Sequence, residues 1–383
     1  MIQVAVKPLR AALKAMTKVV EKRSTVPILS SVLITAGPST MTLTTTDMDL
    51  QMVQQMDHAI PGKGQACSFC VDAGTLSGIA GKLPEDAIAT IKLADGKAII
   101  SAGRSRFTLP VLAAEDFPLM APGSMVGGGW DVQFEIPSTE LVAAIDAVRA
   151  AISTEDVRYY LNGIFLHLPG ERMIAAATDG SRLARYDFEA PEDAAGMADI
   201  IVGRKMVGVL ADLLDDHGGP VEIALSKGRI LVELGTISIT AKLIDGQFPD
   251  YTRVIPTSNE RALWIDPKLL AEAVDRVLTI ADGKTKVVSL ALENDLCRLR
   301  VVSPEKGEAV EELECEYDAD PLTIGFNGRY LLDMLGQLRG RKADDDAEAP
   351  ALTQAMFGDA ATPTLWRDAE DSQRLYVLMP FRV

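Results

Sequence analysis

The chain of 383 residues begins the same pattern three times, and this repeat constrains its fold more than any other feature. Each opening is a run of alternating apolar residues, then a proline, then a stretch with apolar residues at i, i+3, i+4 and i+7. These periods are typical of a strand followed by an amphipathic helix. The prolines are Pro8, Pro137 and Pro267, and proline suits the first helical turn because that turn needs no N–H donor there. We therefore predict three segments of similar structure.

Each segment also contains a second strand–helix unit, so its two halves resemble one another. The second helices are predicted at residues 73–83, 205–214 and 329–338. Gly-rich residues 121–129 and polar residues 256–259 are typical of joints between domains. The sequence predicts an α+β fold of three domains, each with two strand–helix–strands repeats, with bounds at residues 1–128, 129–257 and 258–383.

The composition limits the possible classes of protein. Hydrophobic residues make up 48% of the chain, which is enough for sizeable cores and excludes a wholly disordered protein. The net charge of −16 excludes a simple nucleic-acid binder with a basic surface, so any DNA contact must be local or geometric. The N-terminus lacks a signal-peptide pattern and no apolar run is long enough for a membrane span. We expect a cytoplasmic protein with no membrane contact.

The four cysteines do not predict a metal site. Cys67 and Cys70 match a C-x-x-C pattern, but they stand in a strand-like run, where residues three apart face opposite sides. Cys297 and Cys315 form no second pair of this kind, and the chain has only three histidines. We predict structural cysteines, no metal and no cofactor.

Residues 174–184 predict a β-hairpin, because Asp179-Gly180 stands between two apolar runs and glycine supplies the backbone conformation of a tight turn. One interpretation is a hairpin and nothing more. Another is an α+β enzyme that uses Asp179 as a general base. The sequence contains no partnered base, metal cluster or phosphate loop, so we predict no catalytic residue.

Basic residues recur on one face of the first predicted helix, at Arg10, Lys14, Lys18 and Lys22. A solvated helix face would give the same pattern, but in so acidic a chain the stripe favours a local phosphate-facing surface. Arg204-Lys205 begins a later helix, where free backbone N–H groups also suit phosphate.

Two further stretches suggest binding. Tyr159 and Tyr160 follow Arg158, and on a strand one tyrosine would face the core and the other solvent. The alternative is contact of these aromatic and arginine side chains with nucleic acid. The tail, residues 375–383, is apolar to its end, which predicts an edge strand closing a groove. Met379 suits a surface that accepts several partner peptides.

Several blocks of the sequence resemble one family. They are STVPIL (24–29), SAGRSRFTLPVLAAEDFP (101–118), DVRYYLNG (156–163), ATDGSRLA (177–184), KLIDGQFPDYTRVIP (242–256) and VLMPFRV (377–383). In this order, from end to end, they are similar to the bacterial DNA polymerase III β subunit, the replication sliding clamp. The resemblance implies a head-to-tail homodimeric ring of three similar domains per chain. Helices would line its hole, antiparallel sheets would lie outside, and topology would retain it on duplex DNA.

The same resemblance implies a processivity factor without catalysis. Its partners would be duplex DNA, a second copy of the chain, the DNA polymerase III alpha subunit, the clamp-loader delta subunit, and other polymerases or repair proteins with apolar linear motifs. The implied partner-peptide pocket consists of Leu161, Thr178, Gly180, Ser181, Arg182, Leu183, Pro249, Arg253, Val254, Val377, Leu378, Met379, Pro380, Phe381 and Arg382.

The implied DNA contacts are Arg23, Arg158, Tyr159 and Tyr160, with Arg204 and Lys205 as further candidates beside Arg10 and Lys14 of the basic stripe. The implied ring interface lies near Arg104, Arg106 and Phe107 on one side and near Thr279, Ile280, Glu308 and Glu311 on the other.

The chain departs from the family pattern at several positions. Ser181 stands where some members have histidine, and Phe381 where some have methionine, so both could alter peptide preference. Thr279 is more polar than expected at an interface, and the acidic insert 341–350 has no clear counterpart. A clamp-like paralogue with specialised partners therefore stays an alternative.

Overall fold

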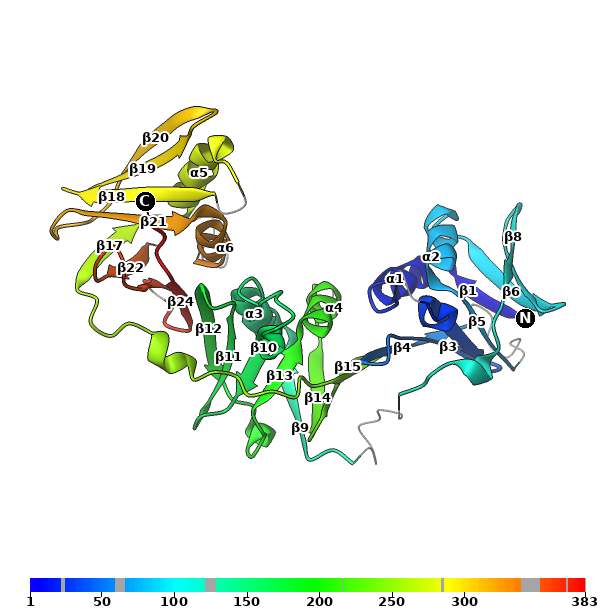
Figure 1. Ribbon diagram of the computed structural model, residues 1–383. Coiled ribbons are helices and arrows are strands. Elements are labelled where there is room, and N and C mark those ends of the chain that lie inside the picture. The colour runs from blue at the N-terminus through cyan, green and yellow to red at the C-terminus, as the bar shows by residue number, and fades with distance from the viewer. Residues whose placement is uncertain are drawn as a thin grey trace. The chain divides into compact units, whose positions relative to one another are not determined.

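The computed structural model describes residues 1–21, 25–58, 66–120, 129–215, 217–283, 286–338, 352–369 and 371–382 (Figure 1). The chain forms two compact units. Unit 1 contains Met1–Val142, Pro191–Ala198 and Lys205–Leu243; unit 2 contains Ala143–Ala190, Asp199–Arg204 and Ile244–Val383. This division differs from the three predicted segments because the middle segment contributes residues to both units.

Unit 1 has an eight-stranded antiparallel sheet and a four-stranded one. The order in the larger sheet is β5 (Cys67–Asp72), β2 (Ser31–Ala36), β3 (Thr40–Thr46), β4 (Leu50–Asp57), β16 (Ile237–Lys242), β15 (Arg229–Leu234), β14 (Pro220–Ser226) and β9 (Val132–Pro137). The smaller sheet has the order β1 (Ile2–Ala5), β6 (Ile88–Ala94), β7 (Lys97–Ala102) and β8 (Ser105–Pro110). The helices are α1 (Val6–Met16), α2 (Ala73–Lys82) and most of α4 (Arg204–Leu214).

Unit 2 repeats this plan. The order in its larger sheet is β13 (Ile200–Gly203), β10 (Gly163–His167), β11 (Arg172–Thr178), β12 (Arg182–Glu189), β24 (Arg374–Leu378), β23 (Thr364–Asp368), β22 (Thr353–Phe357) and β17 (Arg261–Ile265). The smaller sheet has the order β20 (Gly307–Glu314), β19 (Leu296–Ser303), β18 (Val287–Glu293) and β21 (Leu322–Asn327). Its helices are most of α3 (Ser138–Arg149), α5 (Pro267–Val277) and α6 (Gly328–Leu338).

The two large sheets have the same strand order, position by position, which confirms the predicted internal repeat. In each, the first half of one segment joins the second half of the next through one antiparallel pair, β4–β16 in unit 1 and β12–β24 in unit 2. Each small sheet ends at a strand without a neighbour in the described chain, β8 in one and β20 in the other.

The helices form where the apolar spacing and the caps agree. α5 begins at Pro267, after Asp266, whose carboxylate accepts hydrogen bonds from the N–H groups of Lys268 and Leu269. Its buried side chains lie on one face, as the spacing predicts. α1 begins at Val6, and Pro8 lies within its first turn, where no N–H donor is needed.

Two predictions of local structure were wrong. Tyr159 and Tyr160 lie in a short 3₁₀ helix, η3 (Tyr159–Leu161), and not on a strand. The tail strand β24 is not an edge, because β12 and β23 pair with its two sides. The acidic insert 341–350 lies outside the described residues. Among the described helices, none is long and apolar enough to cross a membrane.

Candidate functional site

The turn between β11 and β12 is held by its own side chains. Asp179 Oδ1 accepts hydrogen bonds from the backbone N–H groups of Ser181 (2.9 Å) and Arg182 (3.1 Å). Thr178 Oγ1 donates to the Arg182 carbonyl at 2.6 Å and accepts from the Gly180 N–H at 3.1 Å. Gly180 has a φ of +89°, which favours glycine. The predicted hairpin is confirmed, and the Asp179 carboxylate is engaged in the turn.

An apolar cluster lies on one face of the β12–β24 pair. Leu183 of β12 is opposite Val377 of β24, and both side chains are buried. Leu161 packs with them. The other buried members are Ile174, Ala176, Ile201, Phe248 and Tyr251. Three predicted pocket residues from distant parts of the sequence therefore meet in one cluster.

Exposed apolar side chains follow the strands and turns of this cluster. Val254, Met379 and Phe381 are 51%, 45% and 44% exposed. The Met379 N–H donates to the Ser181 carbonyl at 2.9 Å, which fixes the start of the tail beside the turn. Of the remaining predicted pocket residues, Pro249, Arg253 and Arg382 are exposed and Pro380 is half-buried. The Phe381 N–H donates to the Gly325 carbonyl of β21 at 2.7 Å, so the tail runs from the turn to the small sheet. The buried apolar cluster with exposed Met379 and Val254 next to it suits an apolar peptide.

Aromatic rings fix the segment that contains Phe248. The ring of Phe165 stacks on those of Phe248 and His167, with centroids 4.7 and 4.4 Å away. His167 Nε2 is 2.9 Å from the Tyr251 hydroxyl oxygen, at hydrogen-bonding distance. Burial lowers the pKa of His167 and raises the pKa of Tyr251 to about 12. The sequence analysis did not identify Phe165 or His167, because a strand residue and a lone histidine carry no pocket signal.

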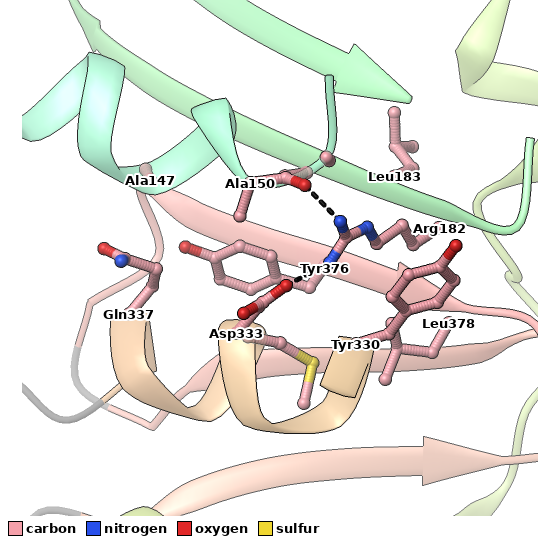
Figure 2. A pocket seen from close by; sticks show the side chains of 12 residues that line it. Ala147, Ala150, Arg182, Leu183, Tyr330, Asp333, Gln337, Tyr376 and Leu378 are labelled. Atoms are coloured by element: carbon pink, nitrogen blue, oxygen red, sulfur yellow. Dashed lines mark hydrogen bonds and ion pairs between the residues drawn. The ribbon is translucent and has the colours of Figure 1, made fainter. Parts of the chain in front are cut away.

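The Arg182 side chain points away from the apolar cluster, because adjacent strand residues face opposite sides of a sheet. Its Nε atom donates to Asp179 Oδ2 at 3.0 Å, Nη1 donates to Asp333 Oδ2 at 2.8 Å, and Nη2 donates to the Ala150 carbonyl. The guanidinium carbon lies 4.0 Å from the centre of the Tyr330 ring. Figure 2 shows Arg182 between Ala150, at the end of α3, and the side chains of α6.

A cavity of about 20 Å³ lies beside Arg182, with room for about one water molecule. Leu378, Gln337 and Tyr376 also line it (Figure 2). The buried Tyr376 hydroxyl has no hydrogen-bond partner within the described chain, and burial raises its pKa. Arg182 and Leu378, both predicted pocket residues, therefore face the helices and not the apolar cluster. The sequence analysis missed Tyr330 and Asp333, because helical spacing does not show which distant strand a residue meets.

The loop before β10 carries Arg158 and the two tyrosines. Arg158 Nε and Nη2 donate to the two Glu155 carboxylate oxygens at 2.9 and 2.8 Å, and Nη2 also donates to the Asp179 carbonyl at 2.8 Å. The hydrogen bond from Arg158 lowers the pKa of Glu155. Tyr159 is 51% exposed, whereas Tyr160 is half-buried and packs against the apolar cluster.

Arg10 and Lys205, two further predicted DNA-contact residues, also have intramolecular partners. Arg10 Nε donates to the Ala80 carbonyl at 3.2 Å and Nη2 to the Leu83 carbonyl at 2.6 Å, at the C-terminal end of α2. Lys205 Nζ forms an ion pair with Asp47 and donates to the Val19 carbonyl at 2.6 Å. These contacts give both side chains a structural role in unit 1.

The remaining basic candidates differ in their surroundings. Lys14 is exposed at the end of α1. Lys18, which lies beyond the end of that helix, forms an ion pair with Asp212. Arg204 Nη1 lies 3.4 Å from the Ser153 carbonyl oxygen. Arg23 lies outside the described residues, so its predicted contact has no structural counterpart here.

The predicted ring-interface residues lie at the free edges of the two small sheets. Arg104 and Arg106 are exposed at the β7–β8 turn and on β8, and Phe107 is half-buried. Glu308 and Glu311 are on β20, where Arg300 and Arg276 already pair with them at 2.5 and 2.6 Å. Thr279 and Ile280 belong to η6 (Leu278–Ile280), which packs beside β19 and β20.

The cysteines are free thiols; Cys70 and Cys297 are buried, as expected of structural cysteines, whereas Cys67 and Cys315 are half-buried. Burial raises the pKa of Cys70 to about 11 and that of Cys297 to about 12, which makes both thiols unreactive. Within the described residues, no group of three His, Cys, Asp or Glu side chains could hold a metal ion.

The comparison with known proteins agrees with this arrangement. The DNA polymerase III beta subunit N-terminal, central and C-terminal domains match residues 2–121, 135–250 and 252–382. The chain belongs to the DNA polymerase III beta subunit family. The beta sliding clamp of Caulobacter vibrioides is 41% identical over 97% of each chain, and that of Pseudomonas aeruginosa is 35% identical over 97% of this chain and 96% of the other.

Solved structures of this family have the same fold. A sliding clamp from Bartonella birtlesii bound to griselimycin has a TM-score of 0.90 and 38% identity, with 100% of this chain and 99% of that one covered. A Pseudomonas aeruginosa clamp has a TM-score of 0.87 and 33% identity over 100% and 99%. The chain is thus a three-domain clamp, a DNA sliding clamp and a non-catalytic processivity factor. The alternative of an enzyme using Asp179 is wrong.

Proposed function

We propose that two copies of this chain close head to tail around duplex DNA, with β8 of one protomer pairing with β20 of the other. The repeat of sheet order supports this proposal. The small sheet that ends at β20 has the topology of β5-β2-β3-β4, and the one that ends at β8 has the topology of β9-β14-β15-β16. Pairing β20 with β8 would make a third sheet of the same order and would cover these two edge strands, with β1 and β21 outermost.

The registers of the existing sheets suggest which residues would meet. Within unit 1, Gln51 is opposite Thr240, and the matching pair in unit 2 is Leu183 opposite Val377. When the same register is applied to β20 and to β8 of the second copy, Glu308 lies opposite Thr108 of the partner subunit. Counting outward along the antiparallel ladder, Val310 faces Arg106 and Glu312 faces Arg104 of the partner subunit.

Charge supports this register. β20 contributes Glu308 and Glu312 to one face, whereas β8 and its turn contribute Arg104 and Arg106 to the same face. Arg298 and Arg300 on β19 already pair with the two glutamates at 2.7 and 2.5 Å. The completed face would alternate basic, acidic and basic strands, an arrangement that favours one orientation of the partner.

We also propose that the apolar cluster and its exposed rim form the pocket for apolar linear motifs of partner proteins. Leu161, Leu183, Val377 and Phe248 would form its floor, and Val254, Met379 and Phe381 its rim, because the rim residues are exposed and apolar. Partners of this kind would be the DNA polymerase III alpha subunit, the clamp-loader delta subunit, and other polymerases or repair proteins. Peptide preference would depend on Ser181 and Phe381.

For DNA, we propose that Arg158, Tyr159, Lys14 and Arg204 meet the phosphate backbone without sequence preference. Tyr159, Lys14 and Arg204 are exposed and the side chain of Arg158 is 35% exposed, which supports this role. Tyr160, Arg10 and Lys205 stay candidates, but their intramolecular contacts favour mainly structural roles. Helices lining the hole, domain bounds near residues 128 and 257, and action in the cytoplasm belong to the same proposal.

A charge-swap experiment tests the ring. Glu308→Lys with Glu312→Lys should convert a dimer of twice the 41.1 kDa chain mass into monomers in analytical ultracentrifugation. Mixing this variant with Arg104→Glu, Arg106→Glu should restore the dimer, since the two reversed edges meet at one interface and the two unchanged edges at the other. Glu222→Lys, an exposed change on β14, is the matched control and should leave the dimer intact. A dimer that survives the double reversal would contradict the β8–β20 pairing.

A further inference from the structure

A continuous chain of hydrogen bonds joins the loop that carries Tyr159 to the rim that carries Met379. Arg158 donates to the Asp179 carbonyl at 2.8 Å. Asp179 Oδ1 then accepts from the Ser181 N–H at 2.9 Å, and the Ser181 carbonyl accepts from the Met379 N–H at 2.9 Å. All of these atoms belong to unit 2.

Arg158 also occupies the space above Gly180. A Cβ atom added to Gly180 would lie 2.4 Å from Arg158 Nη1, so the guanidinium packs directly on the turn. Nε and Nη2 are paired with Glu155, Nη2 also donates to the Asp179 carbonyl, and Nη1 lies over Gly180. A phosphate that took the Nε and Nη2 donors would displace Glu155 and compete with the Asp179 carbonyl.

We propose that Arg158 is a positioning residue that couples DNA contact to partner binding. This inference rests on the function proposed above and states how DNA changes partner binding. The hydrogen bond from Arg158 to the Asp179 carbonyl holds the turn and Met379 in place. When a DNA phosphate binds the guanidinium, that bond is lost and the rim becomes less ordered. The Glu155 carboxylate competes with phosphate for the same Arg158 donors, so it determines how strongly DNA must bind before the guanidinium is displaced. A clamp whose loop touches DNA then holds its partner less tightly than one that slides freely, which favours exchange of partners.

The magnitude follows from the one charge-assisted hydrogen bond that is lost. Loss of such a bond corresponds to a decrease in peptide affinity of about 10-fold. Because coupling is reciprocal, a bound peptide lowers the affinity for DNA by the same factor. The side chain of Arg158 is 35% exposed and that of Glu155 is 60% exposed, so both are accessible to phosphate and the effect falls with rising salt.

The test measures peptide affinity with and without DNA. Fifteen-residue peptides that tile the DNA polymerase III alpha subunit of the same organism are screened, and the tightest is labelled for fluorescence anisotropy. A 30-base-pair duplex at low salt should weaken its binding to the dimeric protein about 10-fold. In Arg158→Gln, affinity without DNA should already be lower and the DNA effect should vanish. Arg149→Gln, which removes a similar exposed pair with Asp146, should retain the full effect.

Hydrogen exchange gives a second readout that needs no peptide. DNA should speed exchange at the N–H groups of Ser181 and Met379 in the original chain and leave them unchanged in Arg158→Gln. Peptide binding that ignores DNA, together with unchanged exchange, would overturn the coupling and leave the clamp function intact. If no peptide binds, the proposed pocket is wrong, while the exchange result still decides whether the loop and the rim are coupled.

Discussion

Replacing Arg182 should destabilise unit 2 and weaken peptide binding only indirectly. The guanidinium joins the β11–β12 turn, the end of α3 and α6 through Asp179, Ala150 and Asp333. Its side chain is 13% exposed and that of Asp179 is 15% exposed, whereas Asp333 is 46% exposed. The Asp179 pair is therefore nearly buried, and the Asp333 pair is largely in solvent.

The size of the effect follows from this difference. Arg182→Gln leaves the nearly buried Asp179 carboxylate without its cation, which costs about 3 kcal/mol, at the low end for breaking a buried pair. Loss of the Asp333 pair adds about 0.5 kcal/mol, because solvent screens it. Asp333→Asn alone should therefore cost less than about 1 kcal/mol. Arg182→Lys should recover only part of the loss, since one ammonium cannot replace three directed donors.

Urea unfolding at fixed protein concentration measures these values. Trp366 is fully buried in unit 2 and reports that unit by fluorescence. A double-mutant cycle with Asp333→Asn isolates the second pair from the first. A loss below about 1 kcal/mol for Arg182→Gln would refute the positioning role. A peptide affinity that collapses while stability is unchanged would show instead that Arg182 contacts the peptide directly.

Two more predictions concern the same region. Gly180→Ala should lower the free energy of unfolding in urea by about 1–2 kcal/mol, because Gly180 has a positive φ and the new methyl group would displace Arg158. An unchanged free energy of unfolding would mean that the turn accommodates the methyl group without strain. For His167, burial lowers the folded-state pKa below that of the unfolded chain, so the unfolded state binds the proton more readily. Its contribution is complete above the unfolded pKa and is lost as pH falls from about 6.5 through the folded value. Between pH 7.5 and 5.5 the original chain should therefore lose more stability than His167→Gln, and equal slopes would exclude this residue as the cause.

The sequence predicted the internal repeat well because repetition is a global signal. The three openings around Pro8, Pro137 and Pro267 led to the repeated unit, and the identical order of the two large sheets confirms it. What the pattern could not show is how halves of successive segments combine. The pairing of β12 with β24 depends on a match between edges that are far apart in the chain, and local periodicity contains no information about that match.

The candidate site illustrates a second limit. The turn at Asp179-Gly180 was predictable because it is local. The face on which each neighbouring side chain lies was not, so Arg182 and Leu378 were grouped with Leu183 although they meet the helices. Likewise the spacing of Arg10 favoured a phosphate-facing stripe, whereas its guanidinium is bonded to the end of α2. Charge periodicity alone cannot distinguish a free cation from one that is held by backbone carbonyls.

The position of β24 inside its sheet determines when, during synthesis of the chain, that sheet can be completed. Leu183 and Val377, which face each other across β12 and β24, come from opposite halves of the sequence. During synthesis, the turn at Asp179 leaves the ribosome long before the strand that completes the apolar floor. A nascent or truncated chain without β24 lacks Val377, so under the proposed function it would have an incomplete apolar floor and would not bind a partner peptide.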